Sequence, residues 1–153
     1  YPPRLAPVLG DLTQLSQVLL NLGTNAIQAI GQGRGVVEIM AEEHPVEDLA
    51  AALPAEVQAA RMSAPLALRW VRMGVHDDGC GMDETTQARV FEPYFTTKPA
   101  GQGTGLGLPT VQGIVRAHGG FIVLRSAPGA GTRFSVWLPA ADTGSSTFPP
   151  QQP

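Results

Sequence analysis

The hydrophobic positions of residues 11–30 follow the period of an α-helix, and the polar positions of the same stretch are unusual. Eight apolar side chains fall on one broad arc of the helical wheel: Leu12, Leu15, Val18, Leu19, Leu22, Ala26, Ala29 and Ile30. A second, narrower arc carries five carboxamides and no charge: Gln14, Gln17, Asn21, Asn25 and Gln28. A solvent-facing helix usually carries Lys and Glu there. This arc therefore indicates a face turned toward a polar ligand, or toward the polar groups of neighbouring loops.

The rest of the chain alternates between short β-patterns and helical patterns. Further helices are expected at 83–90 and 105–118. The expected strands are 36–41, 66–76, 121–126 and 132–138. Gly and Pro in the connection between the last two strands favour a hairpin. The order helix, strand, strand, helix, hairpin predicts an α+β fold, a two-layer α/β sandwich with helices packed on one face of a mixed sheet.

Three stretches lie outside this order. Residues 1–10 contain three prolines and are expected to be an extended lead-in, followed by Asp11 as the helix N-cap. Residues 42–65 are rich in alanine and are interpreted as an insertion with one short helix near 54–62. Residues 140–153, mostly Ser, Thr, Pro and Gln, are expected to be a disordered tail after a single domain at 1–139.

The amino-acid composition excludes some classes of protein but does not identify a function. The chain has 153 residues, 43% hydrophobic content and a net charge of -3, so it can build a core but has no basic excess for binding nucleic acid. Its one cysteine, Cys80, excludes an internal disulfide. No stretch approaches about 18 apolar residues and no charged-then-apolar leader is seen. We expect a cytoplasmic domain, whose full-length protein can still be anchored upstream.

The first glycine cluster, Asp77-Asp78-Gly79-Cys80-Gly81, follows a predicted strand. A carboxylate at the end of a strand can accept a hydrogen bond from the exocyclic amine of a flat heterocycle such as adenine. Glycines beside it allow a sharp turn and leave room for the ring. Taken alone, the pattern is equally typical of a surface turn with a helix-capping Asp.

The second glycine cluster opens the predicted helix at 105–118. Its residues are Gly103, Thr104, Gly105, Leu106, Gly107 and Leu108. Unobstructed N–H groups at a helix N-terminus can hold phosphate. The cluster is not a P-loop, because no Gly-Lys-Ser/Thr follows, and no strand leads into it as a dinucleotide-binding motif requires.

The segment between the two clusters, Phe91-Glu92-Pro93-Tyr94-Phe95-Thr96-Thr97-Lys98, has anchors and a polar tip. Phe91 and Phe95 can anchor a loop, and the Thr and Lys98 tip can close over a ligand. The alternative is a plain surface loop in which Lys98 is an ordinary solvated lysine.

Four motifs in this order resemble the catalytic ATP-binding domain of sensor histidine kinases. They are N-L-x-x-N-A at 21–26, D-x-G-x-G-M at 77–82, F-E-P-Y-F-T-T-K at 91–98 and G-T-G-L-G-L at 103–108. That domain has the Bergerat fold, shared with gyrase, mismatch-repair and heat-shock chaperone ATPases. The resemblance covers roughly residues 10–139 and is strongest to the nitrogen-regulation and hybrid-kinase branch.

The resemblance implies ATP and Mg²⁺ as cofactors and a role for each motif. Asn25 matches the Mg²⁺-coordinating Asn, Asn21 the Asn near the phosphates, and Asp77 the adenine-binding Asp. Residues 96–103 match the ATP lid. The remaining matches are Gly79 and Gly81 beside the base, Phe91 and Phe95 in the aromatic box, and Gly103, Gly105 and Gly107 in the phosphate loop.

Two departures from the family pattern stand out. Many relatives carry a basic residue three positions after the Mg²⁺ Asn, where this chain has Gln28. One phosphate contact is therefore expected to be weaker or to come from Lys98. The stretch at 42–65 is also longer than the usual strand connection.

The kind of reaction is predicted from residue 21. Hydrolysing relatives place a glutamate there to activate water, and Asn21 has no useful basicity. Transfer to an external histidine needs mainly positioning and charge neutralisation. The acceptor is not expected in this chain, because none of His44, His76 and His118 lies in a suitable context.

We therefore expect a kinase module that is monomeric as an isolated fragment. Its partners would be the dimerisation and histidine phosphotransfer domain of its own full-length protein and the receiver domain of a response regulator. The alternatives are a nucleotide-binding regulatory or docking domain without phosphotransfer, and a genuine ATPase.

Overall fold

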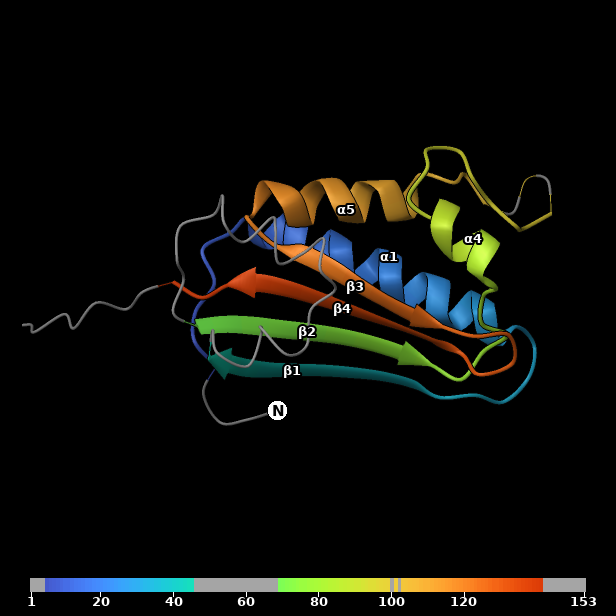
Figure 1. Ribbon diagram of the computed structural model, residues 1–153, viewed down its shortest axis with the longest axis horizontal. Coiled ribbons are helices and arrows are strands. Elements are labelled where there is room, and N and C mark those ends of the chain that lie inside the picture. Colours follow the sequence, from blue (N-terminus) through green and yellow to red (C-terminus); the bar gives the residue numbers. More distant parts are fainter. Residues whose placement is uncertain (1–4, 46–68, 100, 102, 142–153) are drawn as a thin grey trace, which may run out of the picture.

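The computed structural model describes residues 5–45, 69–99, 101 and 103–141. Two long helices cover one face of a four-stranded sheet (Figure 1). The elements in chain order are α1 (Leu12–Ile30), β1 (Val37–Pro45), β2 (Arg69–Asp77), α4 (Glu84–Arg89), α5 (Gly107–Ala117), β3 (Phe121–Ser126) and β4 (Thr132–Pro139). The predicted two-layer α+β architecture is confirmed.

The sheet has the strand order β1-β2-β4-β3, and all three pairings of the described strands are antiparallel. The expectation of a mixed sheet was wrong. The connection through α4 and α5 leaves β2 and β3 running in the same direction, which by itself favours a parallel pair. The last strand, β4, lies between them and pairs with both, so β2 and β3 never become neighbours.

Helix α1 begins and ends where the sequence predicts. The Asp11 carboxylate accepts hydrogen bonds from the backbone N–H groups of Gln14 (3.1 Å) and Thr13 (2.7 Å). These two bonds lower the pKa of Asp11, because they favour the charged form. Gly31 ends the helix with a positive φ of 71°.

The core lies between the helices and the sheet. Helix α1 supplies three buried side chains, Val18, Leu22 and Ala26. They pack with residues of α5 and of the two central strands: Val111, Val115, Val75, Phe134, Val136 and Leu138. Burying a Val, Leu or Phe side chain contributes about 1.5–3 kcal/mol, so this layer fixes the position of α1 over β2.

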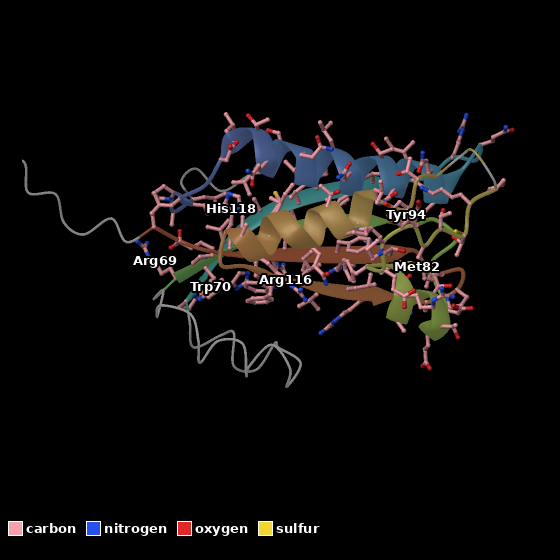
Figure 2. The ribbon with its side chains drawn as sticks, turned by 90° about the horizontal axis from the view of Figure 1, so that it is seen from above. Arg69, Trp70, Met82, Tyr94, Arg116 and His118 are labelled. Atoms are coloured by element: carbon pink, nitrogen blue, oxygen red, sulfur yellow. The ribbon has the colours of Figure 1, made fainter. Side chains whose placement is uncertain are left out.

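Helix α5 runs beside α1, with its end near the beginning of α1 (Figure 2). It begins at Gly107, two residues later than predicted, because Gly105 has a φ of 64° and cannot continue a right-handed helix. At its end, the His118 ring accepts a hydrogen bond at Nε2 from the Asp11 N–H (3.1 Å), with Nδ1 2.8 Å from the Ile114 carbonyl oxygen. This contact joins the C-terminus of α5 to the N-cap of α1.

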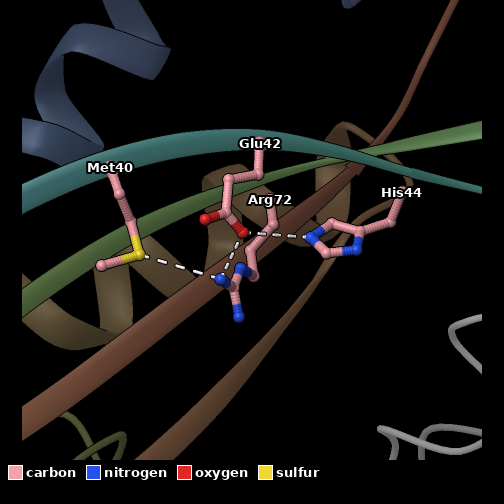
Figure 3. A network of polar contacts seen from close by, with 4 residues as sticks. All are labelled: Met40, Glu42, His44 and Arg72. Carbon is pink, nitrogen blue, oxygen red and sulfur yellow. Dashed lines mark hydrogen bonds and ion pairs between the residues drawn. The ribbon is translucent and has the colours of Figure 1, made fainter. Parts of the chain in front are cut away.

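The opposite face of the sheet carries a polar network and an aromatic cluster. The Arg72 guanidinium contacts the Glu42 carboxylate, which also lies 3.3 Å from the His44 ring (Figure 3). Burial opposes ionisation of Glu42, but the contacts with Arg72 and His44 outweigh it and lower the pKa of Glu42. Trp70 and Trp137 are 4% and 5% exposed. This face is therefore well packed where the two tryptophans lie.

The predicted ends of β1 and of the C-terminal tail also differ from the structure. Strand β1 continues to Pro45, four residues beyond its predicted end, because residues 42–45 pair with β2. The predicted helix at 54–62 lies outside the described residues. Ala140 and Ala141 do not belong to a disordered tail. Ala140 donates to the Arg69 carbonyl and Ala141 to the Pro7 carbonyl, at 3.0 and 2.7 Å.

The predicted lead-in is held at its end, where Val8 forms an isolated antiparallel bridge with Ala140. None of the helices in the described ranges is long and apolar enough to cross a membrane.

Candidate nucleotide-binding site

Three carboxamides in the second half of α1, Asn21, Asn25 and Gln28, contact the second glycine cluster or Lys98. The C-terminal end of α1 lies at the end of the molecule where Figure 2 labels Met82 and Tyr94. Asn21 Oδ1 accepts a hydrogen bond from Gln17 Nε2 (2.9 Å), one turn earlier. Asn21 Nδ2 donates to the Gly107 carbonyl (3.3 Å), in the first residue of α5. Asn21 therefore ties the middle of α1 to the second glycine cluster, which lies 86 residues away in sequence.

Asn25 and Gln28, one turn apart on α1, both contact Lys98. The Lys98 ammonium lies 3.2 Å from Asn25 Oδ1 and also donates to Gln28 Oε1. Burial lowers the pKa of Lys98. The Lys98 ammonium thus lies next to the Asn25 oxygen. A neutral amide oxygen of this kind is a suitable ligand for a cation.

Asp77 lies at the end of β2, under the helices, and is only 3% exposed. Its Oδ1 accepts a hydrogen bond from the Gly79 N–H (2.9 Å), which closes a tight turn. Among the described residues, no hydrogen bond is donated to Oδ2. A carboxylate oxygen that accepts no hydrogen bond from the described residues can accept one from a ligand amine.

Two glycines let this turn approach its neighbours more closely than any other residue could. A Cβ at Gly79 would lie 2.6 Å from the carbonyl carbon of Ala29 on α1. A Cβ at Gly81 would lie 1.9 Å from the Ala127 carbonyl oxygen, and Gly81 also has a φ of 67°. The turn is thus clamped between α1 and the β3–β4 hairpin.

The two ends of the lid segment are joined by the backbone. The Tyr94 N–H donates to the Gly105 carbonyl (2.9 Å), and a Cβ at Gly105 would lie 2.4 Å from Tyr94 backbone atoms. Tyr94 is the only non-glycine residue with a positive φ (66°) among the described residues. These contacts hold together the two ends of the segment that matches the ATP lid.

The two predicted aromatic anchors occupy different surroundings. Phe91 is partly buried and packs against the main core. Phe95 lies under the Arg89 guanidinium, whose central carbon is 4.3 Å from the ring centroid. Arg89 in turn contacts the Glu92 carboxylate (3.0 Å), so the start of the lid is held by apolar and ionic contacts together.

Within the described ranges, the first N–H groups of α5 have no acceptor. Its N-cap, Leu106, has no side-chain capping bond, and the Thr104 hydroxyl instead accepts from the Leu106 N–H (3.3 Å). The N–H groups of the first helical turn that precede Pro109 point out of the helix without an intrahelical acceptor. Leu108 packs partly against the core, and Leu106 is 41% exposed. This helix end fits an anionic group.

A cavity of about 390 Å³ lies elsewhere, at the start of β1. It is lined by Val36, Val37, Glu38, His76 and Asp78. None of the predicted site residues lines it, and His76 and Glu38 are paired on the face of the sheet away from the helices. The candidate nucleotide site is therefore defined by convergence of motifs and not by this cavity.

Two residues that the sequence analysis did not single out shape the site. The Ala29 carbonyl accepts a hydrogen bond from the Cys80 N–H (3.1 Å), and the Ala29 backbone packs closely against Gly79. A small residue one turn after Asn25 was a usable signal for close packing there. Tyr94 sets the base of the lid, and nothing in the sequence indicates its positive φ, because Tyr is not a residue that favours it.

The family model for "Histidine kinase-, DNA gyrase B-, and HSP90-like ATPase" domains matches residues 10–142. The chain belongs to this family. The predicted resemblance is confirmed by relatives and by solved structures.

Curated relatives are sensor kinases. Sensor histidine kinase ZraS of Escherichia coli (strain K12) is 39% identical over 135 residues, which are 88% of this chain and 23% of that protein. Signal transduction histidine-protein kinase AtoS of the same organism is 36% identical over 143 residues, 94% of this chain and 19% of that protein. Sensor kinase CckA of Brucella abortus (strain 2308) is 38% identical over 135 residues, which are 88% of this chain and 13% of that protein. The chain spans less than a quarter of each of these three proteins.

Similar solved structures are histidine kinases as well. The catalytic domain of histidine kinase ThkA, in a nucleotide-free form, matches with a TM-score of 0.61 and 30% identity, covering 87% of this chain and 71% of that one. Full-length ShkA in complex with AMPPNP matches with a TM-score of 0.64 and 28% identity. The match covers 90% of this chain and 24% of that one. The chain is thus an ATP-binding catalytic domain of the histidine kinase type.

Proposed function

We propose that this domain transfers the γ-phosphate of ATP to a histidine on the dimerisation domain of its own full-length protein. An imidazole nitrogen of that histidine attacks the γ-phosphorus, a P–N bond forms, and the bond to the β-phosphate oxygen breaks to release ADP. The imidazole loses its N–H proton to solvent. The partner domain supplies the nucleophile, so the residues of this chain bind and orient the nucleotide.

The adenine would bind beside the first glycine turn. Asp77 would offer a carboxylate oxygen that accepts from the exocyclic amine, while Gly79 and Gly81 allow the close packing that fixes the turn after it. The turn is fixed by its contacts with Ala29 and Ala127, so the Asp77 acceptor would be held in position before the base binds.

The phosphates would lie between α1 and the start of α5. The N–H groups at the N-terminus of α5 face this region, and Asn21 holds Gly107 in place. Mg²⁺ fits the Asn25 oxygen, because the contact with Lys98 supports a cation there. When bound with the nucleotide, the ion supplies neutralisation of phosphate charge.

The single observation that favours phosphoryl transfer over ATP hydrolysis is the chemistry and bonding of the Asn21 side chain. It lies one turn before Asn25, where a hydrolase needs a general base, and it is an amide with both side-chain groups engaged, to Gln17 and Gly107. It cannot take a proton from water. Phosphoryl transfer to a histidine needs no such base, because positioning and charge neutralisation dominate.

A transfer assay tests this proposal. The domain is incubated with γ-labelled ATP and the dimerisation domain of its full-length protein, and label on that partner is followed as an acid-labile, base-stable phosphohistidine. We expect labelling with the wild type and none with Asn25→Ala, whereas Gln14→Ala, a matched carboxamide on α1, transfers normally. Steady release of phosphate without the partner would instead support an ATPase, and ATP binding without label transfer a regulatory nucleotide-binding domain.

The downstream partner would be the receiver domain of a response regulator, since the curated relatives are described as sensor and signal transduction kinases. Label that passes from the phosphohistidine to such a receiver within the same assay tests this part of the proposal separately.

A further inference from the structure

We propose that Gln28 is a positioning residue that holds Lys98 on the phosphate side of the site, so that the lid supplies the cation that many relatives carry on α1. This inference rests on the proposed nucleotide site. It adds to it a specific division of labour: Gln28 provides the acceptor, and Lys98 provides the charge.

The contact between the two is direct and spans 70 residues of sequence. The Lys98 ammonium donates to Gln28 Oε1 and, at 3.2 Å, to Asn25 Oδ1, so two acceptors one turn apart on α1 hold the same group. An ammonium has three donors, and two acceptors on the helix leave one donor for a ligand.

The stem of Lys98 is supported from the second glycine cluster. Its backbone N–H donates to the Thr96 hydroxyl (3.2 Å). A Cβ at Gly103 would lie 2.7 Å from that hydroxyl and 3.1 Å from Lys98 Cδ. The lysine side chain therefore runs between the first glycine of the phosphate loop and the carboxamide arc of α1.

No other cation can easily replace it. Lys98 is the single lysine in the whole sequence. Residues 12–30, 91–99 and 103–110, which form the helix face, the lid base and the glycine cluster, contain no arginine and no other lysine. ATP brings several negative charges into this region, and each direct charge-assisted contact is worth roughly twice a neutral hydrogen bond.

The contact between Lys98 and Asn25 also affects how Mg²⁺ and nucleotide would bind. Without nucleotide, Lys98 occupies the Asn25 oxygen that the proposed function gives to Mg²⁺. For the Asn25 oxygen to hold Mg²⁺, the Lys98 ammonium would have to leave it. Gln28 keeps the displaced ammonium near the phosphates, because its acceptor lies one turn further along α1.

Nucleotide affinities test this inference with four variants. We expect Lys98→Met to weaken ATP binding by about tenfold and to leave AMP binding unchanged. Gln28→Ala should weaken ATP by a smaller factor, and should have no further effect in the Lys98→Met background, because the two act as one unit. Gln28→Lys combined with Lys98→Met moves the cation back to α1 and should recover most of the ATP affinity. Gln14→Ala is the matched control.

A chemical readout is independent of phosphate transfer. Because Lys98 is the single lysine, reductive methylation with formaldehyde and cyanoborohydride reports on it alone once peptide mapping separates the N-terminal amine. We expect ATP to protect Lys98 in the wild type more than AMP does, and Gln28→Ala to raise the labelling rate in the free protein.

The outcomes separate this inference from the proposed function. Unchanged labelling and unchanged ATP affinity in Gln28→Ala overturn the positioning role, even if the wild type binds ATP and transfers phosphate. Equal ATP affinity in Lys98→Met and wild type overturns the role of the lysine. Absence of ATP binding by the wild type would instead remove the proposed function itself.

Discussion

The two sides of the candidate site are built in different ways. On the base side, the turn at 77–81 is locked by backbone packing: a Cβ at Gly79, Gly81 or Gly131 would lie within 2.6, 1.9 or 1.9 Å of backbone atoms. On the side proposed for the phosphates, Lys98 is held by two side-chain acceptors, and one backbone hydrogen bond between Tyr94 and Gly105 joins the two ends of the proposed lid.

This difference indicates that the two sides of the site respond differently to a ligand. Backbone packing leaves little freedom, so the turn that follows Asp77 is held in one conformation. Polar contacts near the surface are easily exchanged for others, so the phosphate side can give up its internal bonds for bonds to a nucleotide at small cost. Base recognition would then depend on shape, and phosphate recognition on charge.

The largest effect is expected from breaking the base side. Gly81→Ala places a Cβ against the Ala127 carbonyl and forces a positive φ on a residue that resists it. We expect a loss of roughly 3 kcal/mol in unfolding free energy, measured by urea denaturation, together with loss of ATP binding. Gly33→Ala is the matched control, because its nearest non-neighbouring atom lies 3.8 Å away. Equal stability of the two variants would contradict the clamp.

A smaller and more local effect is expected at the lid base. Gly105→Ala conflicts with the Tyr94 backbone and with a φ of 64°, but the segment it disturbs carries little of the core. We expect weaker ATP binding, retained AMP binding, and a loss of stability of about 1–2 kcal/mol. Thermal unfolding and calorimetry on the same preparation check this. A loss as large as that of Gly81→Ala would mean that both sides are equally rigid.

A glycine outside the site should behave in the opposite way. Gly113 lies inside α5, and a Cβ added there would have nothing within 4 Å beyond the helix's own backbone, so Gly113→Ala meets no obstacle. We expect a gain of about 0.5–1 kcal/mol from helix propensity, with unchanged ATP affinity. A loss of stability measured by denaturation would show that this helix face contacts something essential.

The smallest effect concerns the helix caps and pH. Backbone N–H groups lower the pKa of Asp11, and the Thr86 N–H lowers that of Asp83. Because both pKa values are lower in the folded chain, their stabilising contribution is present above the unfolded value near 3.8 and is lost as pH falls through the folded value. Melting temperatures between pH 7 and pH 3 should fall less steeply in Asp11→Asn, which keeps the capping acceptor without a titrating group. An identical slope would contradict this.

Local features of the fold could be predicted from the sequence. The helix at 12–30, its Asp11 cap and its apolar arc depend on neighbouring residues, and the structure confirms them. Strand β1 was predicted too short, because Glu42, Glu43 and His44 have no apolar alternation. They continue the strand only through pairing with β2. The antiparallel sheet depends on where the last strand inserts, which no local pattern encodes.

The sequence motifs indicate the candidate site residues, but the contacts between these residues could not be predicted from the sequence. The motifs brought Asn21, Asn25 and Asp77 forward as candidates, and their roles stay predictions until nucleotide binding is measured. The bond from Asn21 to Gly107 joins residues far apart in sequence and follows from the packing of α1 on α5. The same holds for Lys98 and Gln28, whose pairing is a property of the folded chain.

The most direct test of the account is calorimetric titration of ATP, with Mg²⁺, into the wild type and Asp77→Asn. The Asn side chain keeps the acceptor for the Gly79 N–H but replaces a carboxylate oxygen by a donor, so the turn survives while the acceptor for the adenine amine is lost. We predict binding by the wild type and a loss of about 100-fold or more in the variant, with unchanged melting temperature. Equal affinity in both proteins would contradict the central claim that Asp77 recognises the base.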